Sequence, residues 1–117
     1  MPEWAENTHD LIVTIVRKGC VEKIIEASKN AGAEGGTVLS GRGIGIHEGK
    51  KFFGIPIEPE KEILLTLIQK EKTDQVLSNI CKAGEFHKPG TGIGFVVDLQ
   101  RVVGIVHFLQ HLDEESC

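Results

Sequence analysis

Apolar runs and amphipathic stretches alternate along the first half of the chain. A short polar lead-in, 1–9, which we expect to be loosely structured, precedes an uninterrupted apolar run at 11–16. Such a β-branched run is typical of a strand that is buried on both faces. The next positions have the i, i+3, i+4, i+7 spacing of a helix that ends near Gly32: Val21, Ile24, Ile25 and Ser28. After a glycine turn, residues 37–40 predict a second, short strand.

The second half of the chain repeats the first. An offset of 52 residues without a gap aligns the two apolar runs and pairs Thr14 with Thr66. Residues 62–68 therefore predict a third strand, and Thr73 or Asp74 is expected to cap a second helix. The expected buried stripe of that helix is Val76, Leu77, Ile80 and Cys81. The strands expected after it are 94–99 and 102–108.

Two β-α-β units in this order predict an α+β, ferredoxin-like domain with a split βαββαβ arrangement and a further C-terminal strand. Both helices are then expected on one face of the sheet. The strands are apolar on both sides, so we expect the helix-free face to be buried by association with further copies of the chain. The domain is placed at 10–108, between an N-terminal extension at 1–9 and a C-terminal tail at 109–117.

The composition is that of an ordinary globular domain, and it narrows the function classes. The 117 residues carry a formal net charge of −4 with basic residues scattered among acids, so we expect no nucleic-acid partner. No apolar run approaches the ~18 residues of a membrane span, and no signal-peptide pattern is present, so we expect no direct membrane insertion. Three widely spaced cysteines favour a reducing, cytoplasmic location. Two of them, Cys20 and Cys81, fall on the predicted helices and are interpreted as small core residues.

Two glycine-rich segments are candidate sites. Residues 41–56, GRGIGIHEGKKFFGIP, lie between the two halves and hold five of the fourteen glycines, and residues 87–94, HKPGTGIG, precede a predicted strand. Successive glycines let backbone N–H groups point inward together and bind an anion such as phosphate. A helix-to-strand connection also uses glycine for turn geometry alone. Neither segment has the spacing of a P-loop or of a dinucleotide fingerprint, so both interpretations stay open.

No catalytic constellation is visible in the sequence. No Ser-His-Asp or Cys-His arrangement stands out, and the acidic residues are interpreted as solvated faces. His107 and His111 are four residues apart, but their segment is predicted as a strand, and no acid or cysteine stands at ligand spacing. We therefore expect no enzyme activity, no catalytic residue and no metal site.

The repeat, the glycine-rooted loop between its halves and the second glycine-rich segment together resemble the PII family of signalling proteins. The residues that carry the resemblance are GGTVLSGRGIG at 35–45 and KPGTGIGFVVDLQRV at 88–102, and the likeness extends from about Leu11 to Val106. It implies a homotrimer of ferredoxin-like subunits without catalysis of its own. It also implies that adenine nucleotides bind as effectors in clefts between the subunits, with 2-oxoglutarate beside Mg-ATP.

By this resemblance, residues 45–56 correspond to the family's T-loop, called here the output loop, and residues 87–94 to its B-loop, called here the glycine loop. The output loop would dock on a protein target, a transporter or a metabolic enzyme, through Lys50, Lys51, Phe52 and Phe53. The nucleotide-binding residues that the resemblance implies are Thr37, Gly43, Ile44, Gly45, His47, Lys88, Pro89, Gly90, Thr91 and Gly92.

Several positions depart from the family's pattern. A phosphate-binding lysine of the family falls on Ile93, and two phosphate-binding arginines fall on Gly104 and Val106. The T-loop glutamine that joins the Mg-ATP and 2-oxoglutarate site falls on His47. Each lost charge-assisted hydrogen bond is worth about 1.5–3 kcal/mol, so we expect AMP or ADP in preference to Mg-ATP with 2-oxoglutarate. The chain contains no tyrosine, which excludes uridylylation of a loop tyrosine.

An alternative from another class is a structural ferredoxin-like trimer that resembles the copper-tolerance CutA proteins. Such a trimer would hold a metal or no small ligand, and the glycines would serve only as turns. A small enzyme built on the same sheet is a third hypothesis.

Overall fold

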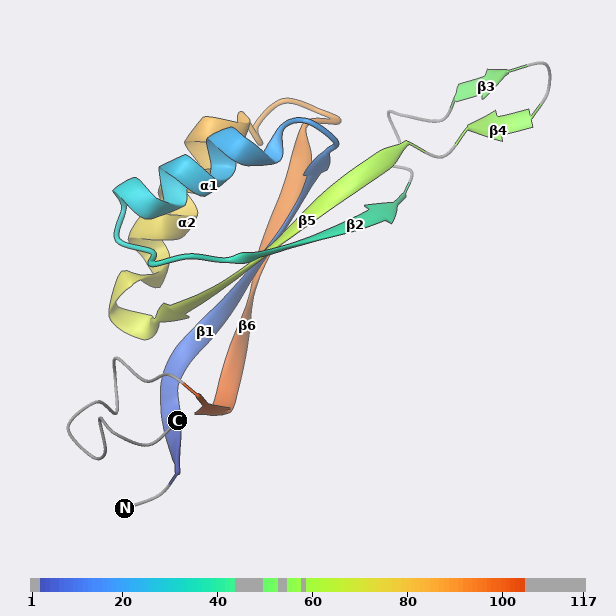
Figure 1. The fold of residues 1–117 in the computed structure, drawn as a ribbon. Coiled ribbons are helices and arrows are strands. Elements are labelled where there is room, and N and C mark those ends of the chain that lie inside the picture. The colour runs from blue at the N-terminus through green and yellow to red at the C-terminus, as the bar shows by residue number, and fades with distance from the viewer. Residues whose placement is uncertain (1–2, 44–49, 53–54, 58, 105–117) are drawn as a thin grey trace.

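The chain folds as an antiparallel sheet with two helices on one face (Figure 1). The computed structural model describes residues 3–43, 50–52, 55–57 and 59–104. The elements in chain order are β1 (Trp4–Arg17), α1 (Val21–Asn30), β2 (Thr37–Arg42), β3 (Lys50–Phe52), β4 (Ile55–Ile57), β5 (Glu60–Gln69), α2 (Lys70–Gly84) and β6 (Gly92–Val103). The four-stranded sheet has the order β2-β5-β1-β6, and β3 and β4 form a separate hairpin. The predicted ferredoxin-like arrangement is confirmed.

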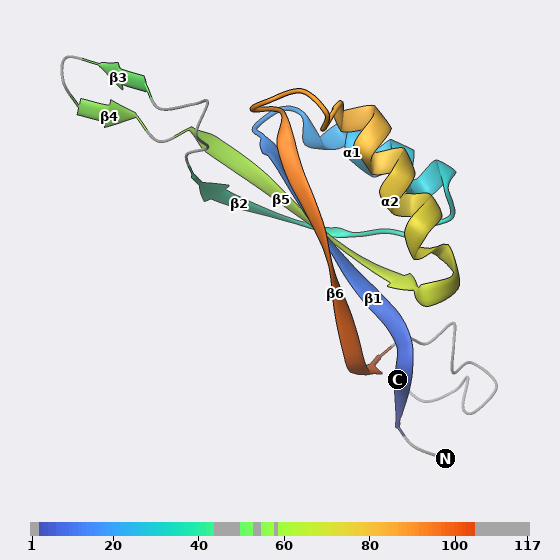
Figure 2. The ribbon, with the colours of Figure 1, turned by 180° about the vertical axis from the view of Figure 1, so that it is seen from behind.

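The predicted repeat is visible in the fold, because β1-α1-β2 and β5-α2-β6 are the same unit. The two helices pack against each other and against the central strands β1 and β5 (Figure 2). Alternation along β1 places Ile12, Thr14 and Val16 on the helix side, where they are buried. The apolar core consists of Ile12, Val16, Val21, Ile24, Ala31, Ala33, Leu64, Ile68, Val76 and Ile80.

Each half of the repeat supplies a carboxylate to the start of the other half's helix. Asp10 on β1 accepts hydrogen bonds from the Thr73 hydroxyl and the Lys70 ammonium of α2, both at 2.7 Å. Glu62 on β5 accepts a 2.7 Å hydrogen bond from the backbone N–H of Gly19, just before α1. Asp10 and Glu62 are themselves related by the 52-residue offset. Carboxylates near helix N-termini interact favourably with the helix dipole, so the two halves stabilise each other's helices.

The second helix begins earlier than the sequence predicts. Its first residue is Lys70, and Gln69 occupies the N-cap position without a side-chain hydrogen bond. The prediction that Thr73 or Asp74 caps this helix is therefore wrong. Thr73 lies within the helix and is buried, because its hydroxyl is engaged with the carboxylate of Asp10.

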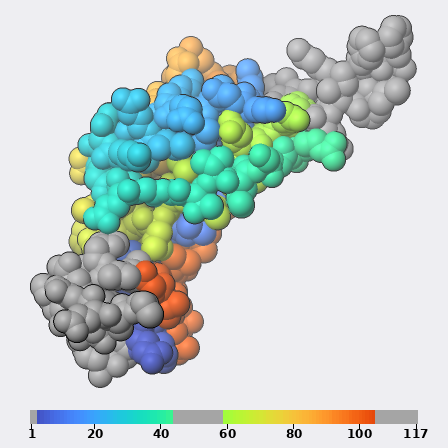
Figure 3. Space-filling view, in the orientation of Figure 1, coloured from blue at the N-terminus to red at the C-terminus, as the bar shows by residue number. Residues whose placement is uncertain are grey.

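The first strand is also longer than expected, because it begins at Trp4 inside the predicted lead-in. Trp4 pairs with Val103 and Glu6 with Arg101 at the end of β6, and Figure 3 shows these two strand ends side by side. The Arg101 guanidinium lies 5.5 Å from the centroid of the Trp4 ring, and the indole N–H donates a 2.8 Å hydrogen bond to Glu6. The prediction of a loosely structured lead-in is therefore wrong from Trp4 onward.

Two further expectations differ from the structure. β6 is one continuous strand from Gly92 to Val103, in place of separate strands at 94–99 and 102–108, and positions 105–108 lie outside the described residues. Cys81 is exposed on α2, so its interpretation as a core residue is wrong. Cys20 is half-buried and packs against the core.

The sheet face opposite the helices is apolar, and no other helix or strand in the described part of the chain covers it. Strand register places two rows across it: Leu39, Ile63, Ile15 and Ile93 in one, and Thr37, Leu65, Val13 and Phe95 in the next. At the β6 edge, Ile93 and Phe95 are 58% and 45% exposed. Apolar surface of this kind on a small protein marks an interaction site, in line with the expected association between copies.

Candidate functional site

The glycine loop connects α2 to β6 and is held in place by side chains. The Arg17 guanidinium at the end of β1 donates a 2.9 Å hydrogen bond from Nε to the carbonyl oxygen of Gly90. The Thr91 hydroxyl lies 3.0 Å from the carbonyl oxygens of both Glu85 and Lys88. These contacts join the loop to β1 and to the end of α2 within a single chain.

Two glycines of this loop are required by the backbone. Gly90 has a φ of +78°, a region that side-chain-bearing residues rarely adopt. At Gly92 an added Cβ would lie 2.7 Å from the carbonyl oxygen of Ile15, because β6 passes close to β1 there. Glycine is therefore needed here for turn geometry, and it also leaves the backbone open to close approach by a ligand.

Lys88 is the charged residue of the glycine loop whose ion pair the structure shows. The Lys88 ammonium lies 2.8 Å from Oε1 of Glu85, at the end of α2. The hydrogen bond from Lys88 holds the pKa of the Glu85 carboxyl below its ordinary value, with smaller contributions from Lys23 and His87. The backbone N–H of Lys88 donates a 2.9 Å hydrogen bond to the carbonyl of Glu85. This N–H, which could otherwise bind a phosphate, therefore already has an acceptor.

The root of the output loop lies at the end of β2. The backbone N–H of Gly43 donates a 3.2 Å hydrogen bond to the carbonyl of Pro59, which closes the root. Beside it is a cavity of about 310 Å³ lined by Lys18, Ser40, Gly41, Arg42, Glu60, Lys61 and Glu62. The Lys18 ammonium lies 2.9 Å from Glu60, and this hydrogen bond lowers the pKa of Glu60 and raises that of Lys18.

The output loop itself contains the β3–β4 hairpin, which pairs Lys50 with Ile57 and Phe52 with Ile55. In Figure 1 this hairpin projects beyond the ends of β2 and β5, away from the helices. The backbone of Lys50–Phe52 forms β3, so three of the four predicted partner-binding residues lie on a projecting strand. The fourth, Phe53, and the predicted nucleotide-binding residues Ile44, Gly45 and His47 lie outside the described residues.

The structure brings the predicted nucleotide-binding residues to different edges of the sheet. One row across the sheet runs from Ser40 on β2 through Glu62 and Val16 to Gly92 on β6. Gly43 and the glycine loop therefore lie at the same end of the sheet but at opposite edges, about 14 Å apart across three strand spacings. Thr37 begins β2 and lies toward the other end. A single chain therefore does not bring the described members of this set into one pocket.

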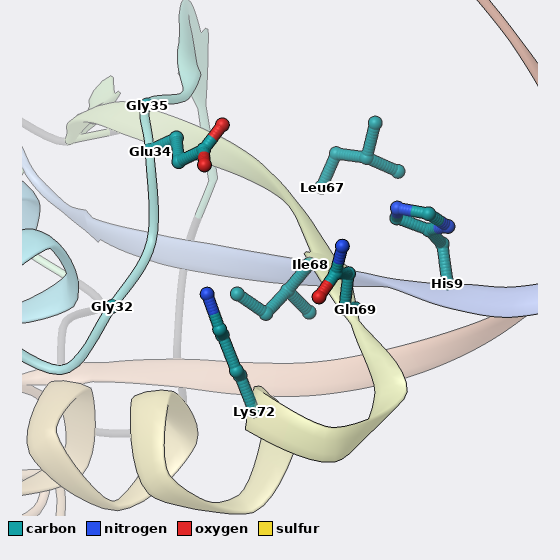
Figure 4. Close-up of a pocket in the computed structure, with 8 residues that line it drawn as sticks. All are labelled: His9, Gly32, Glu34, Gly35, Leu67, Ile68, Gln69 and Lys72. Atoms are coloured by element: carbon teal, nitrogen blue, oxygen red, sulfur yellow. The ribbon is translucent and has the colours of Figure 1, made fainter. Parts of the chain in front are cut away.

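A second cavity, which the sequence analysis missed, lies at the other end of the sheet (Figure 4). It has a volume of about 290 Å³ and is lined by His9, Gly32, Glu34, Gly35, Leu67, Ile68, Gln69 and Lys72. His9 lines it from β1 and is buried, and the Lys72 ammonium points toward the α1–β2 connection in Figure 4. No sequence motif marks this cavity, because it forms where β5 extends past the start of β2 and because His9 stands in a polar stretch of the sequence.

The described residues hold no group of three or more histidines, cysteines, aspartates or glutamates that could bind a metal ion. Among the helices in the described part of the chain, neither is long and apolar enough to cross a membrane.

Comparison with known proteins identifies the family. A search of curated proteins found no match. The crystal structure of Arabidopsis thaliana PII bound to citrate is similar in fold, with a TM-score of 0.61 and 20% sequence identity, over 86% of this chain and 82% of that chain. The model of the family described as nitrogen regulatory protein P-II matches residues 9–107. The match favours the signalling resemblance over the CutA-like alternative, and the chain belongs to the nitrogen regulatory protein P-II family.

Proposed function

We propose that this chain is a non-enzymatic, cytoplasmic regulator of the P-II type. It binds an adenine nucleotide with few phosphates, AMP or ADP in preference to Mg-ATP with 2-oxoglutarate, in clefts between the subunits of a homotrimer. Binding regulates a transporter or a metabolic enzyme through the output loop. The observation that carries the proposal is the glycine loop, whose shape is held by Arg17 and Thr91 before any ligand arrives.

A loop with a fixed shape favours anion binding because its ordering entropy is not lost when the ligand binds. Gly90 and Gly92 keep side chains away from the loop backbone, which allows a phosphate to approach the N–H groups between them. The Lys88 side chain adds one positive charge at the same place.

The small number of cations supports a ligand with few phosphates. Within residues 87–94 the only lysine or arginine is Lys88, and Arg17 already donates to the Gly90 carbonyl. Ile93, which takes the position of a family lysine, presents an apolar side chain that is 58% exposed. The three phosphates of ATP would present more phosphate oxygens than this loop has cations to contact, whereas one or two phosphates match it better.

The separation of the site residues supports a site between subunits. The glycine loop lies at the β6 edge and the root of the output loop at the β2 edge of the same sheet. The apolar face that carries Phe95 and Ile93 gives a second copy a surface on which to pack. Packing of this face in a closed ring would set one chain's edge against another's and complete a cleft that a single chain lacks.

The output loop supplies the regulatory step. The loop and its root, residues 41–56, are rich in glycine, so fixing them in one conformation costs conformational entropy. A nucleotide that contacts the root at Gly43 orders part of the loop in advance, and a protein target then binds more tightly.

Calorimetric titration of the full chain with AMP, ADP, ATP with and without 2-oxoglutarate, and cyclic dinucleotides tests this proposal. We expect micromolar or tighter binding of AMP or ADP and weaker binding of ATP, with no gain from 2-oxoglutarate. The absence of heat with every nucleotide, at protein concentrations that detect micromolar binding, would rule the proposal out.

A further inference from the structure

Glu85 occupies a backbone position that does not favour glutamate. It is the C-cap of α2 and has left-handed φ and ψ values of 53° and 45°. Helices that end in this conformation usually have glycine or asparagine there, because a larger side chain is strained. Among the described residues with a side chain, only Asn7 shares a positive φ, and asparagine tolerates it.

The charge of Glu85 is also unfavourable at this position. The C-terminus of a helix carries a partial negative charge, so a carboxylate there is repelled and a lysine such as Lys82 is favoured. The left-handed backbone and the helix dipole therefore both disfavour a glutamate at position 85, and a compensating interaction is needed to stabilise it there. Residues kept in such positions often have a functional role.

The compensating interaction is with the cations around the glycine loop. The Glu85 carboxylate lies 2.8 Å from the Lys88 ammonium, and Lys23 on α1 and His87 also contribute favourably to its charged form. The carboxylate thus takes the place that an anionic ligand would occupy beside Lys88. Both side chains are about half exposed, so a ligand can reach the pair and displace one partner.

We propose that Glu85 is a built-in competitor for the anion site of the glycine loop. This inference rests on the nucleotide site proposed above and concerns its regulation. A phosphate group gains the full attraction of Lys88 only after the Glu85 carboxylate has moved away. Small or weakly charged anions therefore bind more weakly, and the site favours ligands whose other contacts compensate for that displacement.

The test compares Glu85→Gln with the wild-type chain and uses Glu71→Gln, at the opposite end of α2, as the matched control. Glu85→Gln keeps the side-chain size and removes the charge. We expect ADP to bind about two- to fivefold more tightly to Glu85→Gln, the range for one exposed ion pair, and unchanged to Glu71→Gln. The gain should shrink as salt is raised, because the competing attraction is screened.

A second probe separates this inference from the proposed function. Inorganic pyrophosphate is titrated into both chains while the amide resonances of Gly90, Thr91 and Gly92 are followed. If ADP binds the wild type and Glu85→Gln equally tightly, the proposed role of Glu85 as a competitor is refuted and the nucleotide site is supported. If ADP binds neither chain, the proposed function fails, and the pyrophosphate titration tests the role of Glu85 by itself. Amide shifts at lower pyrophosphate concentration in Glu85→Gln than in the wild type support Glu85 as a competitor. Equal shifts in the two chains, or no shifts, refute that role.

Discussion

The Asp10 carboxylate and the Thr73 hydroxyl, 63 residues apart in sequence, form a buried hydrogen bond of 2.7 Å between β1 and α2. The other oxygen of Asp10 accepts from Lys70, whose ammonium also contacts Asp98 on β6. One carboxylate therefore joins a central strand, an edge strand and the start of a helix. β6 begins at Gly92, within the glycine loop, so this junction helps to fix the strand that the loop leads into.

Replacement of Asp10 by asparagine should destabilise the fold. The amide keeps the size of the side chain but removes the charge that Lys70 and Thr73 satisfy in a buried position. We expect a loss of about 1–3 kcal/mol in the free energy of unfolding, measured by chemical denaturation. Asp74→Asn, an exposed change on the same helix, is the control and should alter stability little. Equal effects of the two substitutions would contradict this account.

The contribution of Asp10 should depend on pH in a defined direction. The hydrogen bond from Lys70 holds the pKa of Asp10 below its ordinary value of 3.8. Because the folded-state pKa lies below the unfolded one, the stabilisation is complete above about pH 5 and is lost as the pH falls through the folded-state pKa. The stability difference between wild type and Asp10→Asn should thus be constant from about pH 5 to 7 and shrink below about pH 4. A difference that grows in acid would show that the sign is wrong.

Thr14 and Thr66, which the repeat pairs, are fully buried, and their hydroxyls have no hydrogen-bond partner among the residues that the structure describes. Valine has the same shape without the polar atom. We expect Thr14→Val and Thr66→Val each to raise the free energy of unfolding by about 1 kcal/mol. Thr37→Val, on the exposed start of β2, should have little effect. A loss of stability in either buried variant would indicate that its hydroxyl has a partner, such as an internal water.

The apolar sheet face should control assembly. Phe95 lies in the row with Val13 and Leu65 and is 45% exposed in one chain. A charge at this position would be buried without a partner in a trimer, so Phe95→Glu should give a 12.8 kDa monomer where the wild type has about three times that mass. Light scattering after gel filtration measures this, with Asn30→Glu at the end of α1 as control. A trimeric Phe95→Glu variant would place the interface elsewhere.

Much of the fold could be predicted because most of its strands and helices follow from the local spacing of apolar residues. The apolar runs at 11–16 and 62–68 and the helical spacing from Val21 predict their elements without reference to the rest of the chain. The boundaries of strands and helices that the sequence predicts wrongly depend on contacts with residues that are distant in sequence. β1 extends back to Trp4 because β6 pairs with it there, and Thr73 is not a cap because Asp10 engages it.

The candidate site was predictable in part for the same reason. Glycine spacing located the glycine loop and the root of the output loop, but only strand order reveals that they lie at opposite edges of the sheet. The ion pair of Glu85 with Lys88 and the cavity beside His9 depend on backbone conformation and register, which composition does not encode. Nucleotide binding by the residues named for it stays a prediction.

Calorimetric titration of ADP into the wild-type chain, Gly90→Ala and Gly19→Ala tests whether the glycine loop binds the nucleotide. Gly90 has a φ of +78°, so alanine strains the glycine loop, whereas Gly19→Ala, at a φ of +93° outside that loop, applies a similar strain elsewhere. The account predicts that ADP binds the wild type and Gly19→Ala and that Gly90→Ala binds at least tenfold (about 1.4 kcal/mol) more weakly while it remains folded. Equal ADP affinity in all three chains would contradict it.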